Sequence, residues 1–189
     1  MASVGLVATS PLMFAVWARV KLVDRDGPVL YAGRRVGSGG REFRMYKFRS
    51  MVMNADKIGG PDTPDDDPRL TGTGRFLRKY KLDELPQLIN VVKGDMSLVG
   101  PRPQVPQEVA NYTEEEREIL KVRPGITDWS SLKFHNEGEI LAGQADPNEA
   151  YNRLIRPEKM RLGLEYARRA TFRDDLSILL KTFLVPFRR

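Results

Sequence analysis

The sequence predicts one compact domain of the mixed α/β class (α+β), rich in helix, with a small β-hairpin and an N-terminal hydrophobic helix. Its 189 residues are 41% hydrophobic and 30% charged, a balance typical of a folded domain with one modest core. Clear helix start signals recur in the second half of the chain. In the first half, two β-prone stretches flank a group of glycines, which indicates a hairpin.

The first predicted element is the uncharged hydrophobic run from Val4 to Ala18, which is expected to enter a membrane. A straight span needs about 20 apolar residues, and this run is shorter. Ser10 and Pro11 are expected to break the helix, because Pro11 removes a hydrogen bond near its middle. Residues 1–22 are therefore predicted to form a re-entrant helix, with the basic residues at its end held at the interface. A buried core helix is the alternative, whereas a signal peptide would carry its charges before the run.

The second predicted element is a β-hairpin within residues 28–51, in which Gly37 to Gly40 separate the two strands. Side chains alternate along a strand, so Lys47 and Arg49 are expected on one face and aromatic residues on the other. Two cations on one face suit an anionic ligand. An ordinary solvated strand face gives the same periodicity and stays open as an explanation.

The middle of the chain is predicted to contain a loop followed by two short helices. Residues 59–68 read as a loop because they are rich in glycine, proline and aspartate. Their four carboxylates match no calcium-loop spacing, so a solvated turn is expected. One helix is predicted after Gly74, and another from about Asp83 to Val92.

Three later helices have start signals at Thr113, Asp146 and Thr171, each with an acid three residues further on. The last of these helices carries an apolar stripe at helical spacing, which is predicted to pack in the core rather than against a membrane. The stripe consists of Leu176, Leu179, Leu180, Phe183 and Phe187.

The composition restricts the chemistry that the chain can perform. It has no cysteine and one histidine, His135, so disulfides, a cysteine nucleophile and the usual zinc sites lack their residues. Its glycines do not have the spacing of a Rossmann or P-loop motif. The formal net charge of +6 favours anionic partners such as phosphates, acidic lipid headgroups or nucleic acid. Carboxylates, cations and a hard metal such as Mg²⁺ are left for catalysis, a set that suits phosphoryl chemistry.

Asp83 and Glu84 are the strongest candidates for catalytic residues. They stand before Pro86, which is tolerated in the first turn of a helix, so they are expected at the electropositive start of that helix. A structural explanation fits equally well from these residues alone. Asp83 would then be a helix cap, a role that contributes about 1 kcal/mol.

The surrounding residues favour a role in catalysis. Arg78 precedes the two acids, and Arg102 stands between Pro101 and Pro103, which restrict the backbone and present the guanidinium to a phosphate. A carboxylate among such cations can act as a nucleophile towards phosphorus, because the cations screen its repulsion from the substrate.

At this point the sequence resembles the monotopic phosphoglycosyl transferases, a bacterial sugar transferase family that starts glycan assembly on polyprenyl phosphate. The motifs that carry the resemblance cover most of the chain, and the long run from LDELPQL to VGPRP is highly specific. They are Ser10 with Pro11, Tyr46–Met51 (YKFRSM), Arg75–Asn90 (RFLRKYKLDELPQLIN), Gly94–Pro103 (GDMSLVGPRP) and Arg123–Thr127 (RPGIT).

The resemblance implies a location as well as an activity. It places a re-entrant membrane helix at residues 1–22 and a catalytic domain with interfacial helices at residues 23–189. That domain would lie on the cytoplasmic face of the bacterial inner membrane. The implied partners are a UDP-sugar, a polyprenyl (undecaprenyl) phosphate and the membrane, with no nucleic acid, and an oligomer is compatible with the sequence.

The resemblance also implies roles for individual residues. Asp83 would attack the β-phosphate of the UDP-sugar, release UMP and carry the sugar phosphate, and Glu84 would complete the catalytic pair. Mg²⁺ would lie near Asp83 and the phosphates. The residues implied in binding the substrate are Lys47, Arg49, Arg78, Arg102, Pro101 and Pro103.

The chain departs from the family pattern after Thr127, where Asp128–Ser131 replace the usual Gly-Trp-Ala-Gln, so contacts to the sugar are expected to differ. His135 and Glu137 fall in this region and are not included among the catalytic residues. Asp175 matches a late family aspartate to which no role is assigned. A basic module that binds membrane surfaces or nucleic acid is the competing function, but it gives no reason for an acid pair beside Arg102.

Overall fold

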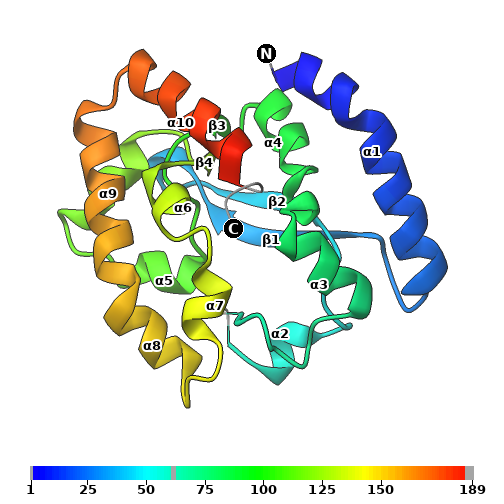
Figure 1. Ribbon diagram of the computed structural model, residues 1–189. Coiled ribbons are helices and arrows are strands. Elements are labelled where there is room, and N and C mark those ends of the chain that lie inside the picture. The colour runs from blue at the N-terminus through cyan, green and yellow to red at the C-terminus, as the bar shows by residue number, and fades with distance from the viewer. Residues whose placement is uncertain (1, 61–62, 186–189) are drawn as a thin grey trace.

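The computed structural model describes residues 2–60 and 63–185, and it confirms the mixed α/β class as one helix-rich domain (Figure 1). Strand β1 (Leu30–Val36) pairs with β2 (Glu42–Phe48), and β3 (Ser97–Val99) pairs with β4 (Gly125–Thr127). The helices are α1 Ala2–Val23, α2 Ala55–Ile58, α3 Gly72–Lys79, α4 Gln87–Lys93, α5 Pro106–Ala110, α6 Trp129–Lys133, α7 Glu137–Leu141, α8 Pro147–Leu154, α9 Arg156–Arg169 and α10 Phe172–Leu184, with short 3₁₀ helices at Ser38–Gly40, Leu82–Glu84 and Glu116–Lys121.

The predicted hairpin is confirmed. Strands β1 and β2 are antiparallel, with Tyr31 opposite Lys47 and Arg35 opposite Phe43. The chain reverses at Gly39 and Gly40, whose φ angles of 66° and 75° lie in the left-handed region that glycine adopts without strain. The smaller sheet is parallel and joins the Gly-Pro-Arg-Pro segment to the segment after Arg123.

Helix α1 is not broken at Ser10 and Pro11, so the predicted helix break is absent from the structure. The helix runs without interruption from Ala2 to Val23. Pro11 has no N–H to donate to the carbonyl of Val7, but the Ser10 hydroxyl donates to that oxygen at 2.7 Å. Because Ser10 replaces the missing hydrogen bond, the helix continues through the proline.

One side of α1 packs against the rest of the domain. Val16 and Val20 are buried together with Phe48 of β2 and Leu77 of α3. Leu82 and Leu85, which flank the two candidate catalytic acids, pack against the same cluster. The helix is apolar and long enough to cross a membrane by length and composition, and most of its apolar window is unburied.

Two of the three later start signals are confirmed as helix caps. Asp146 accepts hydrogen bonds from the backbone of Asn148 and Glu149 at the start of α8, and Thr171 forms a reciprocal capping box with Asp174 at the start of α10. Thr113 and Glu116 also bond reciprocally. The element that follows them is a 3₁₀ helix rather than the predicted α-helix.

The apolar stripe of α10 does not lie in the core, which contradicts the prediction. Leu180 and Phe183 are 61% and 75% exposed, and Phe187 lies outside the described residues. The other side of α10 faces the domain, where Ile178 is fully buried and the Thr182 hydroxyl lies 2.8 Å from that of Thr127. Both sides of this helix carry apolar residues, so the periodicity alone did not identify the buried side.

The acidic loop is not simply solvated, which corrects another prediction. The Asp67 carboxylate is 4% exposed and pairs with Arg69 at 2.6 Å. The Asp65 backbone N–H donates to the carbonyl of Gly138 at 3.1 Å, so the loop is joined to α7. The loop thus has a structural role, because it is attached to α7 in the last third of the chain.

Candidate active site

Asp83 and Glu84 lie in the 3₁₀ helix Leu82–Glu84, between α3 and α4. The chain enters this turn through Lys81, whose φ of 55° is unusual for a residue other than glycine. Helix α4 starts only at Gln87, its N-cap residue is Pro86, and no side chain caps it. Helical backbone therefore begins near Asp83, as predicted, but it does so as a 3₁₀ turn, and Asp83 is not the cap of α4.

Helix α4 is joined to the hairpin by Asn90. The fully buried Asn90 amide accepts from the Tyr46 N–H at 3.0 Å and donates to the Arg44 carbonyl at 2.7 Å. Its side chain thus pairs with the free edge of β2 as a neighbouring strand would. This contact fixes the position of the segment that carries Asp83 and Glu84 relative to Lys47.

The Glu84 carboxylate is held by two cations. Lys47 Nζ donates to Oε1 at 2.9 Å, and the Arg102 guanidinium donates through Nη1 to Oε2 at 3.1 Å and through Nη2 to Oε1. Burial by itself would raise the pKa of Glu84, but the two cations outweigh it and hold the pKa well below its ordinary value. Glu84 raises the pKa of Arg102 in turn. Glu84 is therefore ionised and fully engaged.

Asp83 has a different environment. It is 3% exposed, and its Oδ1 atom has no hydrogen-bond partner among the described residues. Burial, together with the neighbouring charge of Glu84, raises its pKa, whereas the charges of Lys47, Arg78 and Lys81 lower it. A buried carboxylate oxygen without a partner is costly, and a hydrogen-bond donor or a cation at this place would satisfy it.

Lys47 and Arg78 are the other predicted residues that the structure brings to this place. Lys47 projects from β2, and burial lowers its pKa although Glu84 opposes that shift. Arg78, on the last turn of α3, donates to the Thr63 carbonyl at 3.1 Å and contributes positive charge at Asp83.

Arg49 is not part of this site. The strand ends at Phe48, so the alternation that paired Lys47 with Arg49 stops before Arg49. Its buried guanidinium donates to the backbone carbonyls of Asp24 and Asp26, just after α1. Arg49 therefore joins α1 to the domain, and the expected role in binding substrate is not supported by its contacts.

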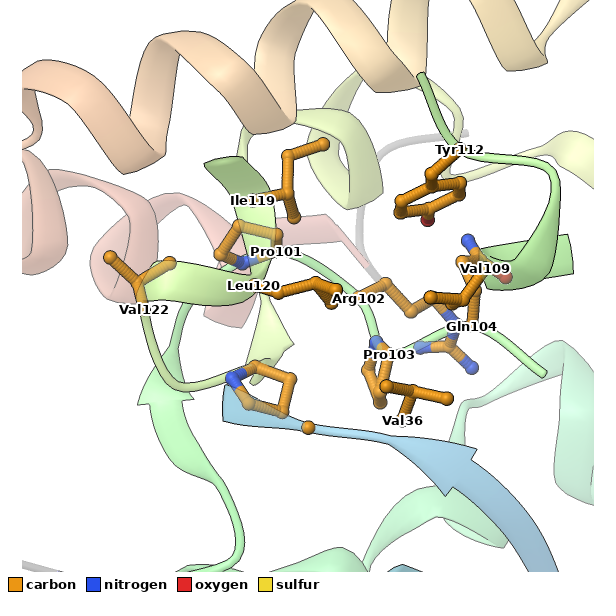
Figure 2. A pocket seen from close by; sticks show the side chains of 12 residues that line it. Val36, Pro101, Arg102, Pro103, Gln104, Val109, Tyr112, Ile119, Leu120 and Val122 are labelled. Atoms are coloured by element: carbon orange, nitrogen blue, oxygen red, sulfur yellow. The ribbon is translucent and has the colours of Figure 1, made fainter. Parts of the chain in front are cut away.

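Pro101 and Pro103 position Arg102 rather than line a substrate cavity. The pocket that they border, with Val36, Tyr112 and Ile119, encloses about 10 Å³, which is room for about one water molecule (Figure 2). On its other side the segment is held by backbone hydrogen bonds, since Gly125 N donates to the Pro101 carbonyl at 3.1 Å. The two prolines thus fix a rigid segment from which the guanidinium of Arg102 reaches Glu84.

Two residues at or near the site were missed by the sequence analysis. Gln87 is fully buried one helical turn after Asp83, and both polar atoms of its side chain lack a partner among the described residues. Arg35 lies on β1, on the same face of the hairpin as Lys47. The alternation of side chains along the first strand is the sequence signal for Arg35, because it separates Arg35 from Arg34 onto opposite faces.

The remaining candidates are structural or peripheral. Asp175 accepts a hydrogen bond from the Tyr166 hydroxyl at 2.6 Å, which ties α10 to α9. Glu137 pairs with Lys159, and its charge contributes to the raised pKa of Arg102, so α7 lies at the edge of the site. Within the described residues, the exposed His135 makes a local contact with the Leu132 carbonyl at 3.3 Å.

Asp83 also fits a hard metal ion. Mg²⁺ commonly binds one or two carboxylates and completes its shell with substrate phosphates and water. The buried Oδ1 atom of Asp83 is an unpartnered hard ligand of this kind. In the described part of the chain no group of three or more acidic, histidine or cysteine side chains could hold a metal unaided. The residues present therefore fit a metal that is held jointly by Asp83 and a phosphate substrate.

The fold and the site together define a class: a mixed α/β protein with an exposed apolar helix, whose buried acid pair is surrounded by cations suited to a phosphate substrate. The bacterial sugar transferase family matches residues 1–189. The chain belongs to this family.

Its relatives carry the names of lipid phosphate sugar transferases. This chain is 38% identical over 200 residues to the undecaprenyl-phosphate galactose phosphotransferase of Salmonella typhimurium. The matched region covers 97% of this chain and 38% of the relative. It is 44% identical over 136 residues to the UDP-N-acetylgalactosamine-undecaprenyl-phosphate N-acetylgalactosaminephosphotransferase of Aeromonas hydrophila. That match covers 69% of this chain and 31% of the relative. It is 36% identical over 187 residues to the UDP-glucose:undecaprenyl-phosphate glucose-1-phosphate transferase of Xanthomonas campestris pv. campestris. That match covers 96% of this chain and 36% of the relative. The chain thus spans well under half of the length of these three proteins.

Proposed function

We propose that this protein transfers a sugar 1-phosphate from a UDP-sugar to a polyprenyl phosphate, with Asp83 as the nucleophile. The observation that carries the proposal is the contrast between the two adjacent acids. Glu84 is held by Lys47 and Arg102, whereas the buried Oδ1 atom of Asp83 has no partner in the described part of the chain. Family membership supports the reaction class, and the names of the relatives support the lipid acceptor.

The proposed reaction has two displacements at one phosphorus atom. In the first, an Asp83 carboxylate oxygen attacks the β-phosphorus of the UDP-sugar, the bond from that phosphorus to the bridging oxygen breaks, and UMP leaves with the electron pair. In the second, an oxygen of the lipid phosphate attacks the same phosphorus, and Asp83 leaves as a carboxylate. The product is a polyprenyl diphosphate sugar. Covalent catalysis of this kind divides one difficult transfer into two.

The neighbouring residues prepare Asp83 for this role. Burial holds the pKa of Asp83 above its ordinary value, which makes the ionised carboxylate a stronger base and nucleophile. Lys47 and Arg78 supply positive charge that opposes repulsion between this carboxylate and the substrate phosphates. Glu84 holds Lys47 and Arg102 in place, so we assign it a positioning role within the catalytic pair.

We further propose Mg²⁺ as the cofactor, held by Asp83 and the phosphates of the substrate. When bound, the ion would neutralise negative charge on the transferring phosphoryl group. The unpartnered Oδ1 atom of Asp83 supports this assignment. Release of UMP should then stop when EDTA removes the metal and resume when Mg²⁺ is restored.

We propose that the protein lies on one face of the bacterial inner membrane, with the catalytic domain in the cytoplasm. The outward side of α1 exposes Val4, Val7 and Phe14, and α10 exposes Leu180 and Phe183. The start of α1 and helix α10 lie at the same edge of the molecule in Figure 1. Exposed apolar helix faces of this kind suit the interface between water and lipid, and a lipid substrate would be delivered there.

The proposal is tested by giving the purified protein a radiolabelled UDP-sugar and Mg²⁺ without lipid. We expect a burst of about one UMP per active site and label on the peptide that contains Asp83, because the first displacement needs no acceptor. Asp83→Asn should give neither, while circular dichroism shows that it is folded. UMP release that strictly requires lipid, with no labelled protein, would exclude the covalent mechanism. A panel of UDP-sugars in the same assay identifies the donor.

A further inference from the structure

Arg35 is a cation beside the site that the proposed mechanism does not use. It lies on β1, and the register with β2 places it on the face of the hairpin that also carries Tyr31 and Lys47. Its neighbour Arg34 points to the other face, where it pairs with Glu42 at 2.6 Å and is 62% exposed. Two consecutive arginines therefore have different surroundings: Arg34 is solvated and paired, whereas Arg35 is half-buried and faces the site.

The guanidinium of Arg35 lacks a carboxylate partner within the described residues. Its Nη1 atom donates a hydrogen bond to the backbone carbonyl of Arg34 at 2.8 Å. Gly33 leaves room for it: a Cβ atom at this position would lie 3.3 Å from Nη1 of Arg35 and 2.8 Å from the ring of Tyr31. The face of β1 thus leaves space for an arginine that forms no ion pair with an acidic side chain of the described residues.

The strand end that carries Arg35 is held beside the segment that carries Arg102. The backbone N–H of Val36 donates to the carbonyl of Gln104 at 3.0 Å, so the end of β1 runs beside the segment that contains Arg102 (Figure 2). Burial lowers the pKa of Arg35, and the positive charge of Arg102 lowers it further. The two positive charges repel each other, and an anion bound by both would relieve that repulsion.

The two acids whose charges act on Arg35 form their ion pairs with other cations. Glu84 is engaged by Lys47 and Arg102, as described above. Glu108 influences Arg35, but it forms its ion pair with Arg156 at 3.8 Å. A ligand is therefore the group best suited to lie between Arg35 and Arg102.

The chemistry of that ligand follows from the proposed function, on which this inference rests. In-line displacement places the entering and leaving oxygens on opposite sides of the phosphorus. Asp83 enters opposite the departing UMP and later leaves opposite the arriving lipid phosphate. UMP and the lipid phosphate must therefore use the same position, and both present a phosphomonoester group there.

We propose that Arg35 and Arg102 form one phosphomonoester subsite, which holds the phosphate of UMP as it departs and then the phosphate of the lipid as it arrives. Arg102 joins this subsite to the acid pair through Glu84. Arg35 supplies the charge on the side away from Asp83. A guanidinium suits this role because its planar set of donors can bind two phosphate oxygens at once.

The test uses the full chain in detergent and compares Arg35→Gln, Arg35→Lys and the matched control Arg34→Gln. Equilibrium dissociation constants are measured separately for UMP and for farnesyl phosphate, a short-chain lipid phosphate. We expect Arg35→Gln to weaken both by at least about tenfold, the loss expected for one charge-assisted hydrogen bond, and Arg34→Gln to weaken neither. Arg35→Lys should recover part of the binding, because it keeps the charge but not the planar fork.

Thermal unfolding separates ligand binding from a structural role. Removing Arg35 relieves its repulsion with Arg102, so unliganded Arg35→Gln should melt no lower than Arg34→Gln and should lose the stabilisation that UMP gives the wild type. Unchanged binding in Arg35→Gln, or a lower melting temperature without ligand and an unchanged ligand-induced shift, would overturn the proposal.

The two ligands also distinguish a shared subsite from a dedicated one. Weakened binding of UMP alone, or of farnesyl phosphate alone, would overturn the shared subsite. Both measurements are independent of turnover. If the wild type releases no UMP from any UDP-sugar, the proposed function fails, but the dissociation constants still decide whether Arg35 binds a phosphomonoester.

Discussion

The carboxylates of Asp83 and Glu84 are adjacent in the chain but have opposite surroundings. Glu84 accepts hydrogen bonds from Lys47 and Arg102, whereas the buried Oδ1 atom of Asp83 has no partner in the described residues. The pKa of Glu84 is accordingly held well below its ordinary value, and the pKa of Asp83 is raised. The two acids should therefore have opposite effects on the stability of the folded protein.

Glu84→Gln is expected to destabilise the protein by roughly 3 kcal/mol, because it leaves Lys47 and Arg102 without their shared counter-charge. Since the folded-state pKa of Glu84 is depressed, its contribution is present above the unfolded value of 4.5 and is lost as the pH falls through the folded value. Urea unfolding of both proteins from pH 7 to pH 3 should show the difference shrinking on acidification. A constant difference across this range would show that the charge of Glu84 is not the cause.

Asp83→Asn should have the opposite effect and give an inactive protein that is more stable than the wild type at pH 7. Burial raises the folded-state pKa of Asp83, so ionisation of Asp83 disfavours folding once the pH exceeds the unfolded value of 3.8. The stability gain should therefore appear as the pH rises above that value and vanish below it. Urea unfolding measures it over the same pH range. A loss of stability at pH 7 would mean that the Asp83 carboxylate has stabilising partners of its own.

The comparison of Lys47 with Arg49 shows how far the sequence could predict this site. The glycines and the alternation of side chains predicted the hairpin, and Lys47 does face Glu84. The same alternation failed for Arg49, because the strand ends at Phe48 and the guanidinium turns to carbonyls more than twenty residues earlier in the chain. Contacts this distant in sequence leave no local periodic signal. The buried side of α10 was missed for a similar reason, since packing against other elements decides which side is buried.

Arg49→Gln is expected to lower stability by about 2–3 kcal/mol while the turnover of the folded fraction stays close to that of the wild type. The substitution removes charge-assisted hydrogen bonds to the Asp24 and Asp26 carbonyls, which join the end of α1 to the domain. Denaturant unfolding gives the stability, and activity is normalised to folded protein. A large fall in turnover at unchanged stability would return Arg49 to the substrate site.

Asn90→Ala should be among the more damaging substitutions away from the reacting groups, with a loss of about 2–4 kcal/mol. It leaves the Tyr46 N–H and the Arg44 carbonyl without their side-chain partner at a buried strand edge. Asn90→Asp tests the donor separately, because the Asn90 amide nitrogen also donates to the Asp95 carboxylate at 3.1 Å. Chemical unfolding should show Asn90→Asp at least as unstable as Asn90→Ala at pH 7, since its buried carboxylate would face the Arg44 carbonyl and the Asp95 carboxylate. Equal stability of Asn90→Ala and the wild type would show that the contact does not join α4 to β2.

The two sides of α1 lead to a prediction of the membrane topology. The helix has 22 residues, so at about 1.5 Å per residue it is long enough to cross a bilayer of about 30 Å. Yet one side of it contacts the domain along most of its length. Val16 and Val20 are buried in the core near its end, and Gly5 lies against Leu88 of α4 near its start. A helix attached in this way cannot cross the membrane without drawing the polar domain into it.

We therefore predict that both ends of α1 lie on the cytoplasmic side, although the helix is not broken at Pro11. The chain contains no cysteine, so a single introduced cysteine reports one position. Ser3→Cys and Arg25→Cys should both resist a membrane-impermeant maleimide in intact spheroplasts and react with it in inverted vesicles. Glu114→Cys, exposed on the catalytic domain, is the control for the cytoplasmic side. Labelling of Ser3→Cys in intact spheroplasts, with Arg25→Cys protected, would show that the helix spans the bilayer and that its contact with α4 does not persist in the membrane.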